Sequence, residues 1–314
     1  RFNGALHMTA LHIETPYFES QALTCHAGRS IWLKMEALQP PGSFKIRGVG
    51  LACQTHAQRG VKRFISSSGG NAGIAVAYAG RQLGIPVTVV VPQTTTERAQ
   101  ALIRLEGAEV MVHGASWQEA NALAVSLLTP SDAFIHPFDD PLLWQGHASM
   151  VDEMAAQGKK PDAIVLSVGG GGLLSGVMEG LHRNGWADVA VIAVETRGAD
   201  SFAQSVAAGE RITLPAITSI ATSLGARQVC QQAWDATKKH TIHSVVVSDQ
   251  EALAACEAFV SDQRVVVEPA CGAALAAVYG RLPVLAPFKT VAVVVCGGVT
   301  ASLAQMRQWA DAAS

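Results

Sequence analysis

Lys45 stands in a sequence context that could support covalent chemistry. It lies between Phe44 and Ile46, directly after a Pro-Gly-Ser turn at 41–43 that could cap a helix. Apolar surroundings lower the pKa of a lysine because they disfavour the ammonium form, and the neutral amine can attack a carbonyl carbon or act as a general base. A lysine with an arginine nearby, here Arg47, is more commonly a solvated surface pair. The local sequence therefore allows a catalytic lysine without establishing one.

Two glycine-rich turns could each hold an anion. Four glycines at 169–172 follow an apolar segment at 163–167 and precede a helical pattern. Backbone N–H groups at the start of a helix converge on a phosphate, and four glycines exceed what a tight turn requires. The second turn, at 66–73, reads Ser-Ser-Ser-Gly-Gly-Asn-Ala-Gly. It leads from a strand into a helix, so its N–H groups and hydroxyls are available to a carboxylate.

A dinucleotide site is the main alternative for the first turn. Glu195 closes the next strand at about the distance where a ribose-binding acid stands in nicotinamide sites. However, when Gly170 and Gly172 take the first two glycine positions of G-x-G-x-x-G, Ser175 falls on the third. The turn therefore fits a single phosphate better than a pyrophosphate.

The segments around these turns alternate between strand and helix patterns. Short β-branched runs predict strands at 31–35, 64–66, 87–91, 110–113, 163–167, 189–194, 245–247 and 291–295. Ala- and Leu-rich segments predict helices at 71–83, 96–105 and 173–182, one from a capping box at 248–251 through Val260, and one from Pro269 onward. This alternation is typical of an α/β fold with open, mainly parallel sheets flanked by helices. Two such domains are expected, with the site in the cleft between them.

Composition narrows the classes of protein that fit. Of 314 residues, 49% are hydrophobic and 15% charged, which suits two packed domains rather than a disordered chain. The formal net charge is -2, so neither a nucleic-acid partner nor a membrane is expected, and no apolar run reaches the roughly 20 residues of a membrane helix. The six cysteines lack C-x-x-C or metal-ligand spacing, which indicates reduced thiols in a cytoplasmic protein.

The first residues are expected to lie outside the fold. Residues 1–7 read as an extension foreign to the native chain, which would begin at Met8. No apolar segment of the kind found in secretory signals follows Arg1.

The order of the motifs resembles the fold-type-II pyridoxal-phosphate enzymes. Ser-Phe-Lys-x-Arg-Gly at 43–48 is followed by Ser-Ser-x-Gly-Asn at 67–71, Gly-Gly-Gly-Gly-Leu at 169–173 and Cys-Gly-Gly at 296–298. The serine/threonine dehydratase branch is the most similar, and the likeness runs from about residue 11 to 308. It implies a tryptophan synthase β-like fold. A large domain would comprise 8–47 plus 142–314, and a small domain 48–141.

The resemblance also implies an activity and roles for individual residues. The expected reaction removes water and ammonia from L-serine to give pyruvate, and L-threonine would give 2-oxobutanoate in the same way. Lys45 would hold pyridoxal phosphate as a Schiff base and, once released, act as the base at Cα. Further cofactor contacts would come from Phe44, Asn71, Gly169, Gly170, Gly171, Gly172, Leu173 and Cys296. The substrate carboxylate would be bound by Ser68, Gly69, Gly70 and Asn71. A homodimer is expected by resemblance alone.

Two positions bear on the choice of reaction. The thiol of Cys296 would face the pyridine nitrogen, and a weak donor cannot supply a counter-charge there. The ring should therefore stay neutral, which favours prompt β-elimination, although a buried cysteine without any role is the alternative. Related serine racemases carry, at the position of Gly69, a serine that acts as acid-base on the opposite face of Cα. The glycine therefore disfavours racemisation.

A cation site is also implied by the resemblance. In this branch a monovalent cation lies beside the cofactor, at positions that match Glu195, Ala199, Ser201, Leu224 and Ala226. Ser201 stands where racemase-like relatives have a carboxylate, so K+ is expected rather than a divalent metal. An ordinary strand-end acid is the alternative for Glu195.

Three rival functions stay open from the sequence. They are a threonine deaminase with a broad pocket, a nicotinamide dehydrogenase that uses the 169–172 turn, and a ligand-binding regulatory protein with a degenerate site. His136 and His147 are expected to be structural, because the chemistry above needs no histidine.

Overall fold

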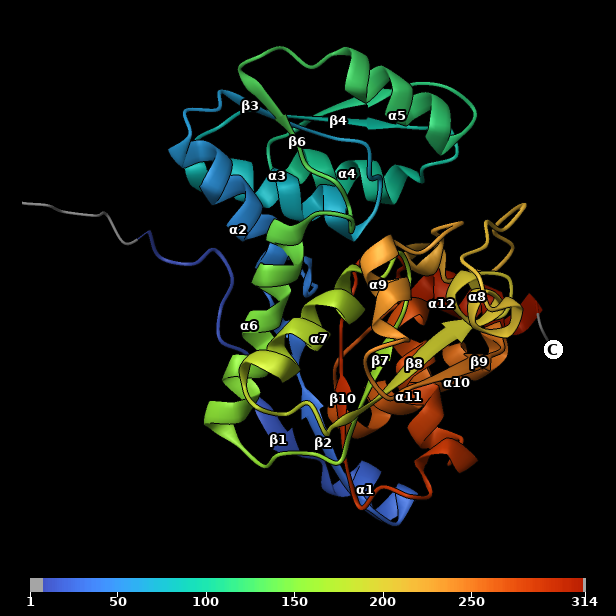
Figure 1. Cartoon of the computed structure of the whole chain (residues 1–314). Helices are drawn as coiled ribbons and strands as arrows, with labels where there is room; N and C mark the ends of the chain where they lie inside the picture. Colours follow the sequence, from blue (N-terminus) through green and yellow to red (C-terminus); the bar gives the residue numbers. More distant parts are fainter. Residues whose placement is uncertain (1–7, 313–314) are drawn as a thin grey trace, which may run out of the picture.

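Two lobes make up the computed structural model, which describes residues 8–312 (Figure 1). The expectation for residues 1–7 lies outside the described residues. One lobe is built on a six-stranded sheet with the order β1-β2-β10-β7-β8-β9, and the other on a four-stranded sheet with the order β5-β4-β3-β6. Strands β1 and β2 pair antiparallel, and every other pairing in the two sheets is parallel. The expected α/β fold with mainly parallel sheets is confirmed.

The strands are β1 (Tyr17–Glu19), β2 (Ser30–Lys34), β3 (Arg63–Ser66), β4 (Val87–Val91), β5 (Glu109–Val112), β6 (Asp132–Phe134), β7 (Ala163–Ser167), β8 (Ala190–Thr196), β9 (Ile242–Val247) and β10 (Thr290–Val294). The helices are α1 (Gln21–Ala27), α2 (Lys45–Gln58), α3 (Asn71–Leu83), α4 (Glu97–Leu105), α5 (Trp117–Ser126), α6 (Pro141–Gln157), α7 (Gly172–Arg183), α8 (Ser201–Ala208), α9 (Gln231–Ala236), α10 (Asp249–Gln263), α11 (Pro269–Tyr279) and α12 (Leu303–Ala312). Short 3-10 helices lie at Glu36–Leu38, Thr222–Leu224 and Pro283–Leu285.

Burial explains why the central strands have apolar sequences. Every residue of β4, β7, β8 and β10 is buried, as expected for parallel strands covered by helices on both faces. The predicted bounds of β4 and β7 agree with the structure residue for residue. One large apolar cluster surrounds the six-stranded sheet, and a second fills the space between α2, α3, α4 and the four-stranded sheet.

Helix starts agree with the sequence to within one residue at α3, α4, α7, α10 and α11, whereas the expected cap of α2 is absent. Ser248 and Glu251 form the predicted capping box at α10, and Thr96 caps α4. The expectation that the Pro-Gly-Ser turn caps α2 is wrong. Phe44 is the N-cap and already has helical backbone angles, and no side chain caps this helix. The Ser43 hydroxyl lies 3.4 Å from the Lys45 nitrogen, too far for an effective cap.

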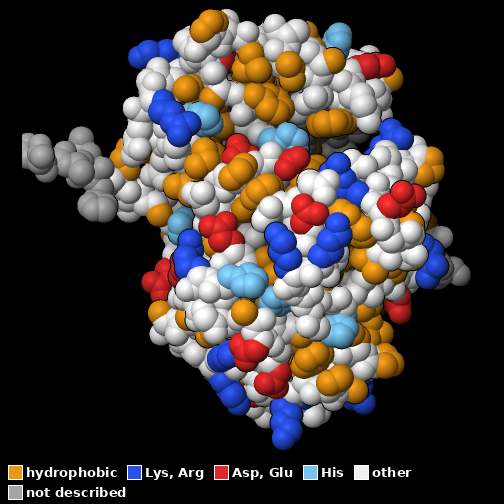
Figure 2. Space-filling model, viewed as in Figure 1, with side chains coloured by type: hydrophobic (Ala, Val, Ile, Leu, Met, Phe, Trp, Pro, Cys, Tyr) orange, Lys and Arg blue, Asp and Glu red, His pale blue; other side chains and the backbone are white. Residues whose placement is uncertain are grey.

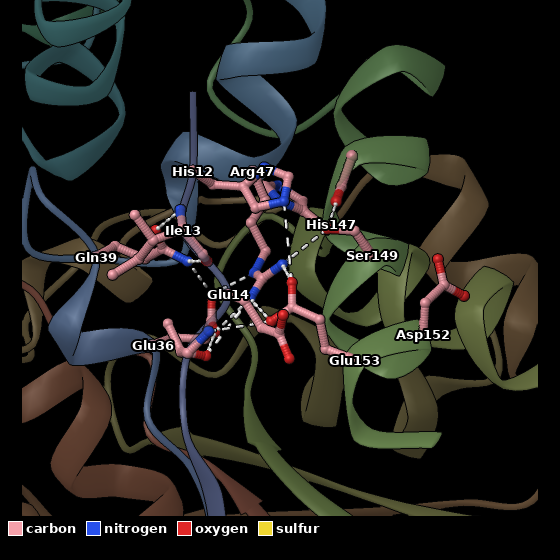
Figure 3. A network of polar contacts seen from close by, with 12 residues as sticks. His12, Ile13, Glu14, Glu36, Gln39, Arg47, His147, Ser149, Asp152 and Glu153 are labelled. Atoms are coloured by element: carbon pink, nitrogen blue, oxygen red, sulfur yellow. Dashed lines mark hydrogen bonds and ion pairs between the residues drawn. The ribbon is translucent and has the colours of Figure 1, made fainter. Parts of the chain in front are cut away.

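Helix α2 is held to the six-stranded lobe by a buried group of charges (Figure 3). We call Lys34, Glu36, Arg47 and Glu153 the Arg47 cluster. The guanidinium of Arg47 donates to Glu36 Oε1 and to Glu153 Oε2, both at 2.5 Å, and Lys34 Nζ donates to Glu153 at 2.8 Å. Lys34, Glu36 and Arg47 are fully buried. Since Arg47 lies two residues after Lys45, the cluster fixes the turn of helix that carries Lys45.

The two sheets suggest where domain boundaries lie. All strands of the four-stranded sheet fall between residues 63 and 134, and α6 then returns the chain to the other lobe. We propose a small domain of 48–141 and a large domain of 8–47 plus 142–314. No helix within residues 8–312 has both the length and the apolar run needed to cross a bilayer.

Candidate functional site

The Lys45 loop is docked on the end of β10. Phe44 donates its backbone N–H to the carbonyl of Cys296 at 3.2 Å, and Gly298 donates to the carbonyl of Gly42 at 2.8 Å. Gly42 and Gly298 have φ values of 88° and 99°, in the left-handed region that glycine adopts without strain. The Pro-Gly-Ser turn and the Cys-Gly-Gly turn therefore form one unit. This unit places Phe44, Lys45 and Cys296 together, as the sequence predicted for the cofactor-binding residues.

The side chain of Lys45 is half-buried, and no carboxylate within residues 8–312 forms an ion pair with its amine. Its Nζ donates to the carbonyl oxygen of Pro137 at 2.7 Å and lies 5.3 Å from the centre of the Phe44 ring. Burial lowers the pKa of Lys45 to about 8, against the opposing influence of Cys296 and Glu268. At pH 8 about half of the Lys45 amines are therefore neutral, compared with roughly one in 250 for an ordinary lysine. The amine has the properties of a nucleophile and of a base.

The glycine turn at 169–172 opens α7 next to the acceptor of Lys45. The side chain of Phe138, which directly follows Pro137, occupies the space where a Cβ on Gly170 would lie. A Cβ on Gly171 would collide with Ala233, and Gly171 has a φ of 95°. Close packing thus requires glycine at both positions. Within residues 8–312, no acceptor takes up the N–H groups of the buried residues Gly170, Gly171 and Gly172. Unpaired donors at a helix start suit a phosphate.

The second turn opens α3 in a similar way. Gly70 is the N-cap of α3, and no side chain caps the helix. The Ser68 hydroxyl accepts the N–H of Gly70 at 3.3 Å, and Ser67 is fixed by a hydrogen bond to Asn121 at 2.8 Å. The start of α3 therefore offers backbone N–H groups that no side chain caps, with the Ser68 hydroxyl beside them. This arrangement suits a small carboxylate.

Asn71 connects the two turns. Its Nδ2 donates to Glu268 Oε1 at 2.6 Å and to the Ser223 hydroxyl at 3.2 Å, and its Oδ1 accepts from the N–H of Val299 at 3.1 Å. The carbonyl of Ser223 lies next to Gly169, where it would be 3.0 Å from an added Cβ. The first residue of α3 is thereby held against the loops of the other lobe.

The thiol of Cys296 is buried and remains protonated. A hydrogen bond with Cys271 and burial raise the pKa of Cys296 well above the usual range of a thiol. The six cysteines are all free. Cys296 is therefore a neutral thiol at the end of the segment that holds the Lys45 loop.

The predicted cation ligands come from the end of β8, the loop 197–200, the start of α8 and the segment 222–226. Both carboxylate oxygens of Glu195 accept backbone N–H groups at the start of α8, from Phe202 at 2.9 Å and Ala203 at 2.8 Å. Burial raises the pKa of Glu195 to about 8, although these hydrogen bonds oppose the shift. The Ser201 hydroxyl is buried and has no partner within the described residues. The segment between α8 and α9 contains Leu224 and Ala226. It contacts the loop after β8 where Thr218 donates its N–H to the carbonyl of Gly198.

The two histidines excluded from the chemistry have structural contacts. His136 Nδ1 accepts the N–H groups of Phe138 at 3.2 Å and Asp139 at 2.9 Å, which shapes the turn after Pro137. His147 is fully buried, its ring meets Phe44 edge-on with 4.9 Å between ring centres, and its Nδ1 accepts the N–H of Gly48. Its Nε2 has no partner within the described residues.

Gly69 has little room for a side chain. Its φ lies outside the left-handed region, so a substitution would not strain the backbone there. An added Cβ would lie 2.8 Å from Cγ2 and 2.9 Å from Oγ1 of Thr95. A side chain at position 69 is thus directed at Thr95, in the loop after β4.

Several residues at the site were not found from the sequence. They are Pro137 and Phe138 beside Lys45, Ser223 and Glu268 around Asn71, and Cys271 beside Cys296. The sequence offered one signal for Glu268, which stands directly before Pro269 and the apolar start of α11. In the space-filling view a notch separates the two lobes on one side, and charges of both signs are interspersed on the face shown (Figure 2).

Comparisons with known proteins agree with this geometry. A family model described as pyridoxal-phosphate dependent enzyme matches residues 8–297. The human protein named L-serine dehydratase/L-threonine deaminase is 51% identical over 308 residues, which cover 95% of this chain and 94% of the human one.

Solved structures show the same fold. A fungal L-serine ammonia-lyase from Rhizomucor miehei superposes with a TM-score of 0.91 at 37% identity, covering 96% of this chain and 99% of the fungal one. A serine racemase from maize superposes with a TM-score of 0.87 at 26% identity, covering 96% of this chain and 93% of that one.

Proposed function

Because the chain belongs to the family of pyridoxal-phosphate dependent enzymes, we propose that it converts L-serine to pyruvate and ammonia, and L-threonine to 2-oxobutanoate and ammonia. The relatives with these activities in their names are about half identical to it over nearly its whole length. The observation that carries the proposal is the position of the Lys45 amine between the Phe44 ring and the carbonyl of Pro137. The next residue, Phe138, packs on the glycine loop at Gly170.

The residues present fit pyridoxal phosphate. Its aldehyde requires a lysine that is neutral near physiological pH, and the pKa of Lys45, lowered to about 8 by burial, satisfies this. Its phosphate requires several donors, and Gly170, Gly171 and Gly172 have N–H groups without acceptors in the described chain. Asn71 would bind the ring hydroxyl, Phe44 would cover one ring face, and Leu173 would complete the phosphate site.

Lys45 would act twice in the reaction. When bound, pyridoxal phosphate withdraws electrons from the Cα atom of the attached amino acid and so makes its proton acidic. Once released from the cofactor, Lys45 Nζ would take the Cα proton as a general base. Loss of the β-hydroxyl as water leaves an enamine, which takes up water to give pyruvate and ammonia.

The turn before α3 would orient the substrate. A carboxylate bound by Ser68, Gly69, Gly70 and Asn71 at the helix start fixes the amino acid at one end. The Cα–H bond can then point at Lys45 Nζ, and correct orientation is worth several orders of magnitude in rate.

Cys296 favours elimination over reactions that need a long-lived carbanion, and Gly69 disfavours racemisation. A protonated thiol leaves a ring nitrogen without a counter-charge, which shortens the life of a carbanion at Cα. Racemisation needs a second acid-base group on the face opposite Lys45, and Gly69 has no side chain to supply one.

We also propose a K+ site formed by Glu195, Ala199, Ser201, Leu224 and Ala226. The unpartnered Ser201 hydroxyl and the buried Glu195 carboxylate support it. Since a cation binds the ionised carboxylate, and the pKa of Glu195 is raised to about 8, protons compete with K+ at lower pH. Replacing Na+ by K+ should raise the activity, and the K+ concentration that gives half of this increase should be higher at pH 7 than at pH 9. Strong inhibition by a chelator of divalent metals, reversed by Mg2+, would contradict the K+ assignment.

The setting of the enzyme is part of the same proposal. We infer that it acts as a homodimer in the cytoplasm. Light scattering on the purified protein tests the first statement, and fractionation of the source cells tests the second.

A panel of substrates tests the proposed function directly. The purified enzyme with pyridoxal phosphate should release keto acid from L-serine and L-threonine, and much less from the D-enantiomers. Lys45→Ala should abolish the release because it removes both the attachment point and the Cα base, whereas the exposed Lys62→Ala should leave it unchanged.

The same panel can refute the proposal. A nicotinamide dehydrogenase would lack the absorbance band of pyridoxal phosphate bound to a lysine. An inactive binding protein would show that band but release no keto acid. Near-normal turnover by Lys45→Ala, with borohydride still fixing the cofactor to a lysine, would show that Lys45 is the wrong residue. Interconversion of L- and D-serine by the wild type, at a rate close to that of pyruvate formation, would favour a racemase instead.

A further inference from the structure

Glu268 is a buried carboxylate with hydrogen bonds at both ends and no counter-ion. It precedes α11 and is 3% exposed. Its Oε1 accepts from Asn71 Nδ2 at 2.6 Å, and its Oε2 accepts from the hydroxyl of Thr300 at 2.6 Å and from the N–H of Thr300 at 3.2 Å. No Lys, Arg or His of residues 8–312 forms an ion pair with it. An isolated buried charge is costly, so these three donors must stabilise it.

The contacts of Glu268 cross from one lobe to the other. Asn71 is the first residue of α3, which packs on the four-stranded sheet, whereas Glu268 and Thr300 follow elements of the six-stranded lobe. Glu268 is separated from Asn71 by 197 positions in the chain. The carboxylate is thus a polar connection between the lobes at the site itself.

The same contacts leave only one orientation for the Asn71 amide. Its oxygen must face the N–H of Val299, and its nitrogen must face the carboxylate of Glu268. The second amide hydrogen is directed at Ser223, over the longer distance of 3.2 Å. This weaker contact is the one that a ligand can replace without loss of the other two.

We propose that Glu268 is a positioning residue, which holds the Asn71 amide so that its second hydrogen is presented to the ring hydroxyl of pyridoxal phosphate. This role rests on the proposed function, which makes Asn71 a cofactor ligand. Glu268 does not touch the reacting atoms in this role, and acts only through Asn71.

A carboxylate is needed because both of its ends accept. A glutamine in its place would put an NH2 group against either the Asn71 amide nitrogen or the N–H of Thr300. At one end of the glutamine side chain, two hydrogen-bond donors would then face each other. An aspartate would keep the charge but, being one methylene shorter, could not reach both partners.

A double-mutant cycle through Asn71 tests the proposal. The dissociation constant of pyridoxal phosphate is measured for the wild type, Glu268→Gln, Asn71→Ala and the double variant, together with kcat and KM for L-serine. Glu268→Gln should weaken cofactor binding about tenfold, the value of one hydrogen bond to a charged group. It should lower kcat more than it changes KM. In the Asn71→Ala background the same substitution should have less than about a twofold effect, because the pair acts as a unit.

Controls separate positioning from general destabilisation. Glu257→Gln makes the same charge change at an exposed position of α10 and should leave the dissociation constant unchanged. Thermal unfolding of the cofactor-free variants reports any loss of fold. Glu268→Asp is a second variant that retains the charge, and it should weaken binding in the same direction as Glu268→Gln.

Three results would overturn the proposal. Glu268→Gln could behave like Glu257→Gln, its effect could multiply with that of Asn71→Ala, or Glu268→Asp could bind the cofactor as the wild type does. If Glu268→Gln does not fold, Glu268→Asp and its cycle with Asn71→Ala decide. Cofactor binding is measured without turnover, so an enzyme that releases no keto acid would refute the proposed function and still leave the role of Glu268 open to this test.

Discussion

The Arg47 cluster can be compared with the group of Lys45, Asn71 and Glu268 between the lobes, which we call the cleft. Both contain ionisable groups shielded from solvent, but the partners of these groups differ. In the cluster, two cations and two anions form direct ion pairs, and the partners of Arg47 hold it at 2.5 Å on both sides. In the cleft, Lys45 donates to a backbone carbonyl and Glu268 accepts only from neutral groups. The ion pairs favour the charged forms of the side chains in the cluster. Lys45 has no such ion pair and can lose its proton more easily.

The pKa directions in the two regions follow from these partners. Burial by itself would raise the pKa of Glu153, but the hydrogen bond and charge of Arg47 outweigh it and the pKa is lowered. For Lys45 burial prevails, and the pKa is lowered to about 8. Two residues on the first turn of α2 thus differ in kind, since Arg47 anchors the helix through ion pairs and Lys45 is the residue to which we assign the proposed chemistry.

Removal of the central cation should produce the largest change in stability. Arg47→Met leaves Glu36 buried without a cation and removes one of the cations paired with Glu153, so the free energy of unfolding should fall by about 3–5 kcal/mol. Urea unfolding of the cofactor-free protein measures this. Arg183→Met, which breaks the half-exposed pair with Asp152, is the matched control and should cost less than about 1 kcal/mol.

A second substitution sharpens the result. Glu36→Gln in the Arg47→Met background removes one of the stranded charges and should restore part of the stability. If Arg47→Met instead lowered turnover and left stability intact, the cluster would belong to the catalytic machinery, and the contrast with the cleft would be wrong.

The pH dependence of cofactor attachment should be the next largest effect. Only the neutral Lys45 amine attacks the aldehyde, so the rate of attachment to the cofactor-free protein should rise about tenfold between pH 7 and pH 9 and then level off. Stopped-flow absorbance records this rate. Because Glu268 raises the pKa of Lys45, Glu268→Gln should move the midpoint to lower pH. A rate that continues to rise beyond pH 10 would mean that Lys45 behaves as an ordinary solvated lysine.

The contrast between the regions also explains what the sequence could predict. The two glycine turns are strand–turn–helix motifs within short stretches, so their elements could be identified locally. Helix α2 was not predicted, and Lys45 was singled out by its local sequence context instead. The Arg47 cluster and the Asn71–Glu268 pair join residues that are far apart in sequence, for example 106 positions between Arg47 and Glu153. Such pairings depend on the tertiary fold, and no local pattern indicates them.

Missed elements have local causes. Helix α6 was not predicted because Gly146, His147 and Ser149 interrupt its apolar pattern, although Asp140 and Pro141 begin it in a standard way. The edge strand β1 has only three residues, and two of them are exposed. The Ser43 cap was wrong because the backbone is already helical at Phe44.

The smallest effect is expected at the rim of the cleft, where no ion pair restricts the side chains. The Cβ of Gly69→Ala would lie too close to the half-buried Thr95, which has to shift, while the φ of position 69 imposes no backbone strain. The substitution should therefore change kcat for L-serine by only a few-fold, through the orientation of the carboxylate turn, and lower stability by about 1 kcal/mol. Thr95→Ser removes the Cγ2 atom that meets the new Cβ, so the double variant Gly69→Ala/Thr95→Ser should recover most of the loss, whereas Thr95→Ser alone should have little effect. Steady-state kinetics and thermal unfolding of the four proteins measure both quantities. If Gly69→Ala were as damaging as Arg47→Met, or if Thr95→Ser gave no recovery, the rim would be as tightly constrained as the Arg47 cluster, and the freedom inferred for the cleft would not extend to its substrate-binding turn.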